Sequence, residues 1–240
     1  MRIAIVSDIH GNQTAFEAVL ADLKETTPDV VLHVGDLANS GSAPAEIVDR
    51  IRDLGWPGVM GNTDELLVRP EALEAFASQS SAPTALWQAI REIAAVTREM
   101  LGKERLAWLS DLPAIHLQSS LALVHASPND MWRVPGPETP EAELKKLYGS
   151  LDRQVVVHGH THLPSIRSLV GGRFIIDTGS VGLPYDGDPR ASYLLLEENA
   201  PSIRRVVYSI DREVAALASS GMPHAPWIAK MLRTASPQLP

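Results

Sequence analysis

Three short apolar runs near the start of the chain each stop at a polar cluster, and this recurrence most constrains the fold. The runs cover residues 3–6, 30–34 and 58–60. Segments 15–24 and 44–54 lie between them and carry apolar residues at helical spacing. The pattern predicts a β-α-β-α-β unit, in which the crossover rules make the strands parallel neighbours in one sheet. The polar clusters then meet at one edge of that sheet, where functional loops gather.

The rest of the chain divides into a helical stretch, a strand-rich part and a tail. Residues 70–112 have apolar residues at mostly helical intervals, which predicts a helical excursion that either overhangs the site or packs on the sheet. Strands are expected at 114–117, 121–124, 155–157, 173–176, 192–196 and 204–209, in a mixed or antiparallel sheet. From about residue 220 the chain is rich in Pro and Ala, so we expect a loosely docked tail. We interpret residues 1–240 as a single domain.

Composition limits the partners and the chemistry. Hydrophobic residues make up 45% and charged residues 21% of the 240 residues, as in ordinary globular proteins. There is no cysteine, so any metal must be held by oxygen and imidazole nitrogen. The formal net charge of -8 disfavours bulk nucleic-acid binding, although bound cations can change the sign of a pocket. No segment resembles a signal peptide or a membrane span, so we expect a cytoplasmic protein, and a homo-oligomer is compatible with the sequence.

The polar clusters after the first three runs offer oxygen and nitrogen donors. Asp8 and His10 are separated by one residue, so an extended backbone would place both side chains on the same side, where they can grip one ion. Asp36 has two carboxylate oxygens, which suits a ligand shared by two cations. Asn62 follows a glycine and adds a carbonyl oxygen. Taken singly, each cluster is also explained as a surface turn, a helix cap or a Gly-Asn turn.

The second half of the chain supplies histidines. His125 ends one apolar run, and His160 and His162 follow another. Two histidines one residue apart again face one side of an extended segment, as metal ligands require. His158 shares that alternation, but we assign it a structural or supporting role. Five polar clusters at five strand ends thus offer three oxygen and four nitrogen donors, enough for two ions, and this donor set suits Mn, Fe, Zn, Co or Ni.

In this order, the clusters resemble those of the calcineurin-like metallophosphoesterases. The matching motifs are Asp8-x-His10, Gly35-Asp36, Gly61-Asn62-x-Asp64, His125 and Gly159-His160-x-His162, and residues 7–12, 179–182 and 186–190 resemble the small bacterial phosphodiesterase-like branch. The resemblance implies an α/β fold, a four-layer α/β/β/α sandwich of two mixed sheets flanked by helices, with the site at the sheet edge. It also implies two divalent metal ions, with manganese favoured and Fe, Zn, Co, Ni or Mg as alternatives.

The resemblance further implies a ligand set and a reaction. The first metal would be held by Asp8, His10, Asp36 and His162, and the second by Asp36, Asn62, His125 and His160. A metal-bridging hydroxide would attack phosphorus in line with the leaving group. Asp36, Asn62, Asp64 and His10 are therefore expected to be catalytic, and Asn12 and Arg190 to bind substrate.

One position departs from the family's pattern. Many members have a histidine between the Asn and the Asp of the third motif, whereas this chain has Thr63, which cannot act as a general acid at neutral pH. Asp64 is then expected either to hold the loop or to orient the His10 ring. The departure favours hydrolysis of phosphodiesters, on a small or nucleotide-like phosphate ester, over a phosphomonoesterase or nucleotide phosphatase. A nuclease and a non-catalytic scaffold, like the retromer subunit that resembles this family, are the competing hypotheses.

Overall fold

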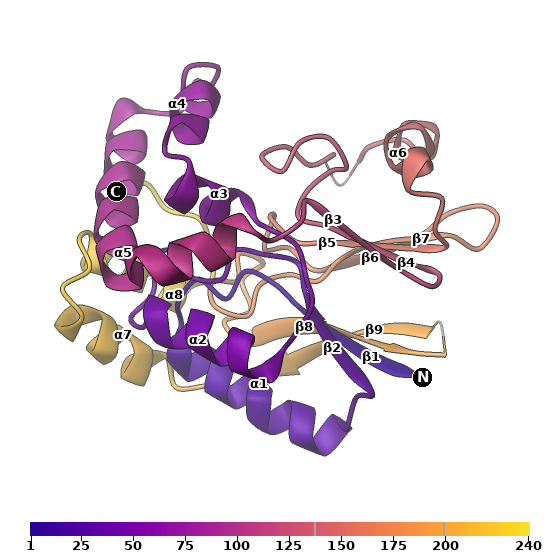
Figure 1. The fold of residues 1–240 in the computed structure, drawn as a ribbon, viewed down its shortest axis with the longest axis horizontal. Helices are drawn as coiled ribbons and strands as arrows, with labels where there is room; N and C mark the ends of the chain where they lie inside the picture. The colour runs from indigo at the N-terminus through magenta and orange to yellow at the C-terminus, as the bar shows by residue number, and fades with distance from the viewer. Residues whose placement is uncertain (137, 199) are drawn as a thin grey trace.

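The computed structural model describes residues 1–136, 138–198 and 200–240 (Figure 1). Its strands are β1 (Arg2–Val6), β2 (Val30–His33), β3 (Ile115–Gln118), β4 (Leu121–Val124), β5 (Val155–His158), β6 (Ser165–Ser168), β7 (Phe174–Asp177), β8 (Ala191–Glu197) and β9 (Ala200–Val206). Its helices are α1 (Gln13–Thr26), α2 (Pro44–Leu54), α3 (Asn62–Val68), α4 (Glu71–Ala77), α5 (Thr84–Ser110), α6 (Glu141–Tyr148), α7 (Ile210–Ser219) and α8 (Ala225–Thr234), with a short 3-10 helix at Gly149–Leu151.

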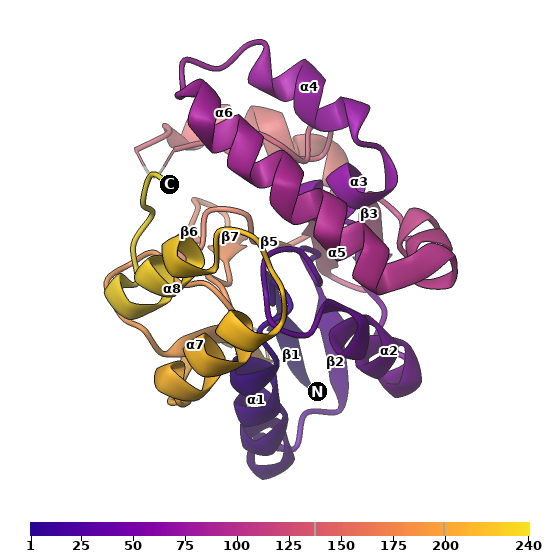
Figure 2. The same cartoon turned by 90° about the vertical axis from the view of Figure 1, so that its left-hand side faces the viewer.

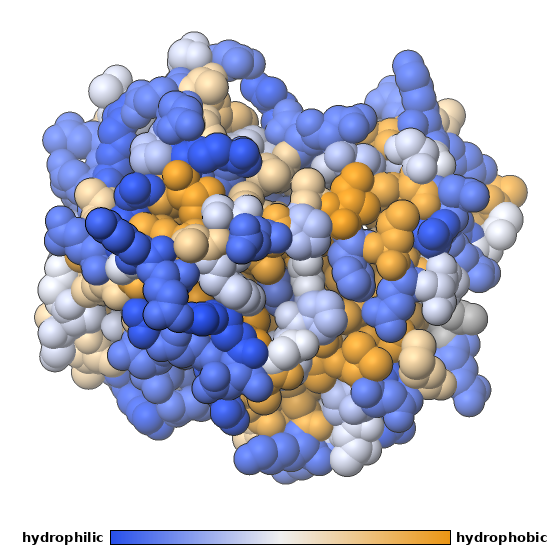
Figure 3. Space-filling model, viewed as in Figure 1, coloured by the Kyte–Doolittle hydropathy of each residue, from blue (hydrophilic) through white to orange (hydrophobic). Residues whose placement is uncertain are grey.

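The strands form two mixed sheets that lie face to face (Figure 1). The first has the order β2-β1-β8-β9, in which β1 is parallel to β2 and antiparallel to β8. The second has the order β3-β4-β5-β7-β6, with parallel central strands and an antiparallel strand at each edge. Figure 3 shows a mostly hydrophilic face with apolar patches between the charged side chains.

Period-two alternation decides which layer each strand residue enters. In β1, Ile3 and Ile5 pack between the two sheets, while Ala4 and Val6 pack against α1 and α2. In β5, Val156 turns away from the sheet interface and packs against α6. Helices therefore cover the outer face of each sheet, and the four-layer α/β/β/α sandwich predicted from the sequence is confirmed.

The remaining helices gather at the end of the sandwich where the strands of the β-α-β unit finish. Figure 2 faces this end and shows α4 and α5 on one side of the strand ends and α7 and α8 on the other. The helical excursion over 70–112 consists of α4 and α5, and α5 bends at Gly102, whose φ of +67° interrupts the helix. In the parts of the chain that are described, no helix has both the length and the apolar character needed to cross a membrane.

The tail that we expected to be loose from about residue 220 instead contains α8. Ile228, Met231 and Leu232 of this helix are buried in a cluster with Ile93 of α5 and Leu217 of α7. Their spacing of three and four residues gives α8 one apolar face. The surrounding Pro and Ala concealed that face in the sequence, and the expectation of a loose tail is wrong for this helix.

The third strand expected in the first half is also corrected. Residues 58–60 make a single parallel bridge, between Gly58 and His33, in place of a strand. Pro57 has no N–H to offer a ladder, and α3 begins soon afterwards, at Asn62. Too little chain remains between these two points for regular pairing.

Candidate functional site

The loops that follow four strands meet at one end of the two sheets and bring the expected donors together. In chain order these are Asp8 and His10 after β1, Asp36 after β2, Asn62 at the start of α3, His125 after β4, and His160 and His162 after β5. His160 is half-buried and the other six are buried. Donors that are up to 154 residues apart in sequence (162 minus 8) thus share one small volume.

Asp8, His10 and His162 form a first cluster. Nε2 of His162 lies 3.2 Å from Oδ1 of Asp8 and 3.1 Å from Nε2 of His10. Nε2 of His10 lies 3.8 Å from the same Asp8 oxygen. Ser7 donates a hydrogen bond to the other oxygen of Asp8, so Oδ1 is the oxygen that faces the two rings.

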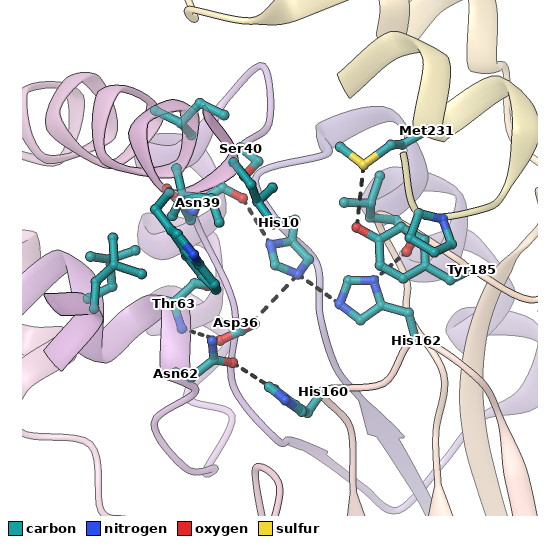
Figure 4. Close-up of a pocket in the computed structure, with 18 of the residues that line it drawn as sticks. His10, Asp36, Asn39, Ser40, Asn62, Thr63, His160, His162, Tyr185 and Met231 are labelled. Carbon is teal, nitrogen blue, oxygen red and sulfur yellow. Dashed lines mark hydrogen bonds and ion pairs between the residues drawn. The ribbon is translucent and has the colours of Figure 1, made fainter. Parts of the chain in front are cut away.

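Asp36 links this cluster to a second one. Its Oδ2 lies 3.6 Å from Nε2 of His10, whereas its Oδ1 lies 3.5 Å from Nε2 of His125. Oδ1 of Asn62 lies 2.8 Å from His125 Nε2 and 2.9 Å from Nδ1 of His160. Figure 4 shows His10, Asp36, Asn62 and His160 around one space. The two oxygens of one carboxylate therefore face two sets of donors, which is the geometry of a bridging ligand.

Backbone carbonyls decide which ring nitrogen faces inward. Nδ1 of His10, His125 and His162 lies within hydrogen-bond distance of the backbone carbonyl of Asn39, Val34 and Leu183, respectively. A neutral imidazole has one proton, and a carbonyl can only accept, so each Nδ1 carries the proton and donates it. Each Nε2 is then left as a lone-pair donor directed at the clusters, as in metal-binding histidines.

The two clusters have the character of cation sites. The Nε2 atoms of His10 and His162 lie 3.1 Å apart, and with the ring protons on Nδ1 their lone pairs would repel. Asp8 Oδ1 is buried and receives no hydrogen bond from the described residues, and leaving such an atom unpaired costs about 1–3 kcal/mol. The donor atoms of Asp8, His10 and His162, and those of Asp8, Asp36 and His125, lie within 4.8 Å of one another. Divalent cations would satisfy all of these groups, so the residues fit a dinuclear metal site.

The backbone at the donors differs from our expectation. The φ angles of Asp8 and His10 are +53° and +50°, that of Asp36 is +55°, and those of His160 and His162 are +71° and +60°. The left-handed region is uncommon outside glycine and costs on the order of 1 kcal/mol per residue. The side chains converge because the loops turn sharply, so the expectation of an extended, alternating backbone is wrong although the same residues meet.

Asp64 is tied to the backbone of the loops that carry the donors. Its buried carboxylate accepts hydrogen bonds from the N–H groups of Asp36 at 2.7 Å, Leu37 at 3.0 Å and Gly61 at 3.0 Å. Burial and the nearby Asp36 carboxylate raise the pKa of Asp64 to about 7, while the N–H donors act to lower it. Asp64 does not orient the His10 ring, which was the alternative role. The backbone carbonyl of Asn39 orients that ring instead.

Burial makes the charges of the site interact strongly. Burial by itself would raise the pKa of Asp8, but His162, His125 and His10 hold that pKa below its usual value. Burial, followed by the charge of His125, lowers the pKa of His160 to about 4. Burial and the neighbouring His162 also lower the pKa of His10. Near neutral pH, Asp8 is therefore ionised and the His10 and His160 rings are neutral, which are the protonation states that bind cations.

Asn12 and Arg190, which we expected to bind substrate, have other contacts. Asn12 is the N-cap of α1, where its Oδ1 accepts from Ala15 N at 2.9 Å and its Nδ2 donates to Gly182 O at 2.8 Å. Arg190 is exposed and pairs with Asp188 at 2.6 Å. Neither belongs to the described residues that line the cavity above the donors, and a role of either residue in substrate binding stays a prediction.

His158 lies outside the two clusters. Its Nδ1 is 3.3 Å from Oδ2 of Asp177, and its ring stacks on Tyr148 with 6.2 Å between ring centroids. Thr161 also donates to Asp177, at 2.6 Å. These contacts anchor the loop that carries His160 and His162.

No motif in the sequence indicated the cavity that lies above the donors. It has a volume of about 500 Å³, and α3, α4, α5, α8 and the end of the chain contribute to its lining. Trp87, Trp132 and Tyr185 are among its aromatic residues, and Tyr185 stacks on His162 with 4.4 Å between ring centroids. The helical excursion over 70–112, which we expected either to overhang the site or to pack on the sheet, supplies α4 and α5 to this lining.

A sandwich of two mixed sheets that presents two sets of carboxylate, amide and imidazole donors at its edge defines the class of metal-dependent phosphoesterases. Residues 1–200 match the calcineurin-like phosphoesterase superfamily domain, and the chain belongs to this superfamily.

Relatives match over most of the chain. It is 29% identical to the uncharacterized protein MJ0912 of Methanocaldococcus jannaschii, with 96% of each protein covered. It is 28% identical to the phosphodiesterase YfcE of Escherichia coli, over 85% of this chain and 91% of YfcE. The crystal structure of a metallophosphoesterase from Sphaerobacter thermophilus matches with a TM-score of 0.77 at 28% identity, covering 98% of this chain and 99% of the other.

Proposed function

We propose that this chain is a divalent-metal-dependent phosphoric ester hydrolase that favours phosphodiesters. The observation that carries the proposal is the position of Asp36, whose two oxygens face His10 and His125 at 3.6 and 3.5 Å. In this proposal one ion is held by Asp8, His10, Asp36 and His162, and a second by Asp36, Asn62, His125 and His160. The resemblance to the superfamily favours manganese, and the oxygen and nitrogen donor set also suits Fe, Zn, Co or Ni, with Mg as a further alternative.

The two cations, when bound, supply an activated water and neutralise charge on the phosphoryl oxygens. The chain contributes the placement of the donors. Backbone carbonyls keep the imidazole protons on the outer nitrogens, and Asp64 fixes the backbone beside Asp36 and Gly61. A side chain at Gly61 would collide with Oδ1 of Asp36, so glycine allows α3 to begin against that carboxylate. Donors that are fixed in advance need no reorganisation during the reaction.

The preference for diesters is inferred from Thr63. Its buried hydroxyl belongs to the cavity lining beside Asn62, and a hydroxyl is no acid at neutral pH. The relative from Escherichia coli is named a phosphodiesterase, which supports the same choice. A phosphomonoesterase or nucleotide phosphatase is the second candidate, since one metal centre serves many phosphate esters. A non-catalytic scaffold is disfavoured because all seven donors face one another.

Hydrolysis of bis(p-nitrophenyl) phosphate and p-nitrophenyl phosphate, each with Mn²⁺, tests the proposal. We expect the diester to be hydrolysed faster, and Asp36→Asn to lose at least about 100-fold in rate because the shared ligand is weakened. Asp53→Asn makes the same change at an exposed position and should keep the native rate. A native protein that is inert with every cation would contradict the proposal, and a strong monoester preference would overturn its diester part.

A further inference from the structure

The cavity above the donors has a polar floor and two mainly apolar walls. Its volume of about 500 Å³ lies within the range of small-molecule sites. The floor consists of five of the donor side chains, those of His10, Asp36, Asn62, His160 and His162 (Figure 4). Phe76 and α5 contribute one wall, and Tyr185 and α8 contribute the other. Figure 2 shows α5 and α8 on opposite sides of the strand ends. The last residues of the chain also belong to the lining. A group bonded to a phosphorus atom at the floor would extend between these walls.

The charge of the cavity is confined to its floor. Apart from the histidines and Tyr185, Asp36 is the one ionisable acid or base among the described lining residues, and no lysine or arginine is among them. Arg133 packs over the Phe76 ring at 5.3 Å and pairs with Asp130 without joining the lining. Since proteins hold phosphates with lysine, arginine or metal, a second phosphate between the walls would lack a cation. The walls therefore suit an uncharged group.

The walls are aromatic and aliphatic, with a few isolated polar atoms. The Phe76 ring packs edge-on against Trp87 at 5.9 Å and lies tilted against Trp132 at 5.1 Å. Trp87 Nε1, Asn39 Oδ1 and Thr63 Oγ1 belong to the lining residues, are buried, and have no hydrogen-bond partner in the described parts of the chain. Isolated polar atoms of this kind orient a ligand, while the apolar area supplies its affinity.

We propose that the cavity holds the organic arm of the ester, and that this arm is a large, uncharged, mainly apolar group attached to a single phosphoryl group. The inference rests on the proposed function and names the substrate class of the same site. Polyphosphates and highly polar arms are disfavoured, because the first need cations and the second need more hydrogen bonds than the few isolated polar atoms of the lining supply. Each buried methylene of the arm is expected to raise affinity roughly fourfold.

A series of p-nitrophenyl alkyl phosphodiesters separates the arm from the chemistry. The methyl, butyl and octyl esters share one leaving group and differ only in the apolar arm. We expect kcat/KM with Mn²⁺ to rise at least about 30-fold from methyl to octyl. Equal values would overturn the inference while the proposed function stands. A higher kcat/KM for the p-nitrophenyl ester of adenosine 5′-phosphate than for the octyl ester would overturn it as well.

Variants of α5 test whether the dependence of kcat/KM on the length of the alkyl arm arises in this cavity. Ile90→Trp and Leu86→Trp place an indole in the lining, and Ala85→Trp places the same indole on the exposed side of the same helix. We expect the octyl-to-methyl ratio of kcat/KM to fall at least about fivefold in the first two variants and to stay native in the control. An unchanged ratio in the lining variants would contradict the assignment. Should one of them fail to fold, the other decides.

Binding provides a readout that needs no turnover. Octyl phosphate and methyl phosphate can be titrated into the Mn²⁺-loaded protein by calorimetry. We expect octyl phosphate to have a Kd at least about 30-fold lower. A protein that is inert toward every ester but selects octyl phosphate would refute the hydrolase proposal and support the cavity assignment. Equal binding of the two phosphates would overturn the assignment.

Discussion

Different interactions hold the floor and the walls of the cavity in place. The floor is a set of buried polar groups whose positions are fixed by backbone hydrogen bonds, as at Asp64, which accepts three of them. The walls are apolar side chains on helices and at the end of the chain, where Leu239 is 62% exposed. Polar donors tolerate little displacement, whereas apolar packing tolerates changes of shape. We therefore expect the floor to control the chemical step and the walls to control which substrate binds.

Removing the Asp64 carboxylate, which braces the floor, should have the largest effect, and this effect is on the free energy of unfolding. Asp64→Ala leaves three N–H groups without their acceptor, so we expect the free energy of unfolding to fall by about 4 kcal/mol. Urea unfolding in EDTA measures this loss without a contribution from metal. Asp53→Ala, at an exposed position, is the control. A loss below about 1 kcal/mol for Asp64→Ala would show that the floor is not braced in this way.

Displacing one donor without removing it tests the rigidity of the floor. The added methyl of Gly61→Ala would collide with Oδ1 of Asp36. A shift of about 1 Å at a reacting centre costs on the order of 100-fold, which is the loss of diester hydrolysis that we expect. Gly149→Ala adds the same methyl where nothing lies within 4 Å and should keep the native rate. Native rates in both variants would mean that the floor is as adaptable as the walls.

The strand beneath the floor should make stability depend on pH. His33 is fully buried in β2, and burial, with a smaller effect of His116, lowers its pKa from 6.5 to about 3. Between these values the unfolded chain binds a proton that the folded chain does not. The free energy of unfolding therefore falls as pH falls through this window, by up to about 1.4 kcal/mol per pH unit. Urea unfolding in EDTA should show a shallower dependence for His33→Leu, and identical slopes would refute the assignment.

Removing the end of the chain from the cavity lining should have the smallest effect, and this effect is on the choice of substrate. Pro237, Gln238 and Leu239 belong to the lining, and Gln238 O accepts a hydrogen bond from Trp227 Nε1 at 3.0 Å. Ending the chain after Ser236 should lower the octyl-to-methyl ratio of kcat/KM about threefold and leave the metal content unchanged. Loss of metal in this variant would show that the walls and the floor are coupled.

Much of the fold was predictable because its signals are local. The alternation in β1 and the helical spacing in α1 and α2 follow from residues that are near in sequence. The edge strand β6, with serine at both ends and a half-buried arginine, has no apolar alternation to reveal it. The helix α8 was missed because the Pro and Ala around Ile228, Met231 and Leu232 concealed their helical spacing.

The site was predictable in its members and unpredictable in its geometry. The seven predicted donors lie together in the structure, and their role as metal ligands stays a prediction. They stood out in the sequence because acidic, amide and imidazole residues follow apolar runs in an order that resembles one family. The left-handed backbone at Asp8 and His10 depends on hydrogen bonds to the loop after β2, including His10 N to Asp36 O at 3.0 Å. The capping role of Asn12 depends partly on Gly182, which is 170 residues away. Contacts of this range leave no periodic trace in a sequence, and the same holds for the cavity walls.

The central claim is that two cations share Asp36 and act together on the ester. The most direct test titrates Mn²⁺ into the metal-free protein and follows both bound metal and hydrolysis of bis(p-nitrophenyl) phosphate. We predict that turnover appears as the second equivalent binds, and that Asp36→Asn binds fewer than two equivalents and loses turnover. Full turnover with one equivalent, or a native rate in Asp36→Asn, would contradict the claim.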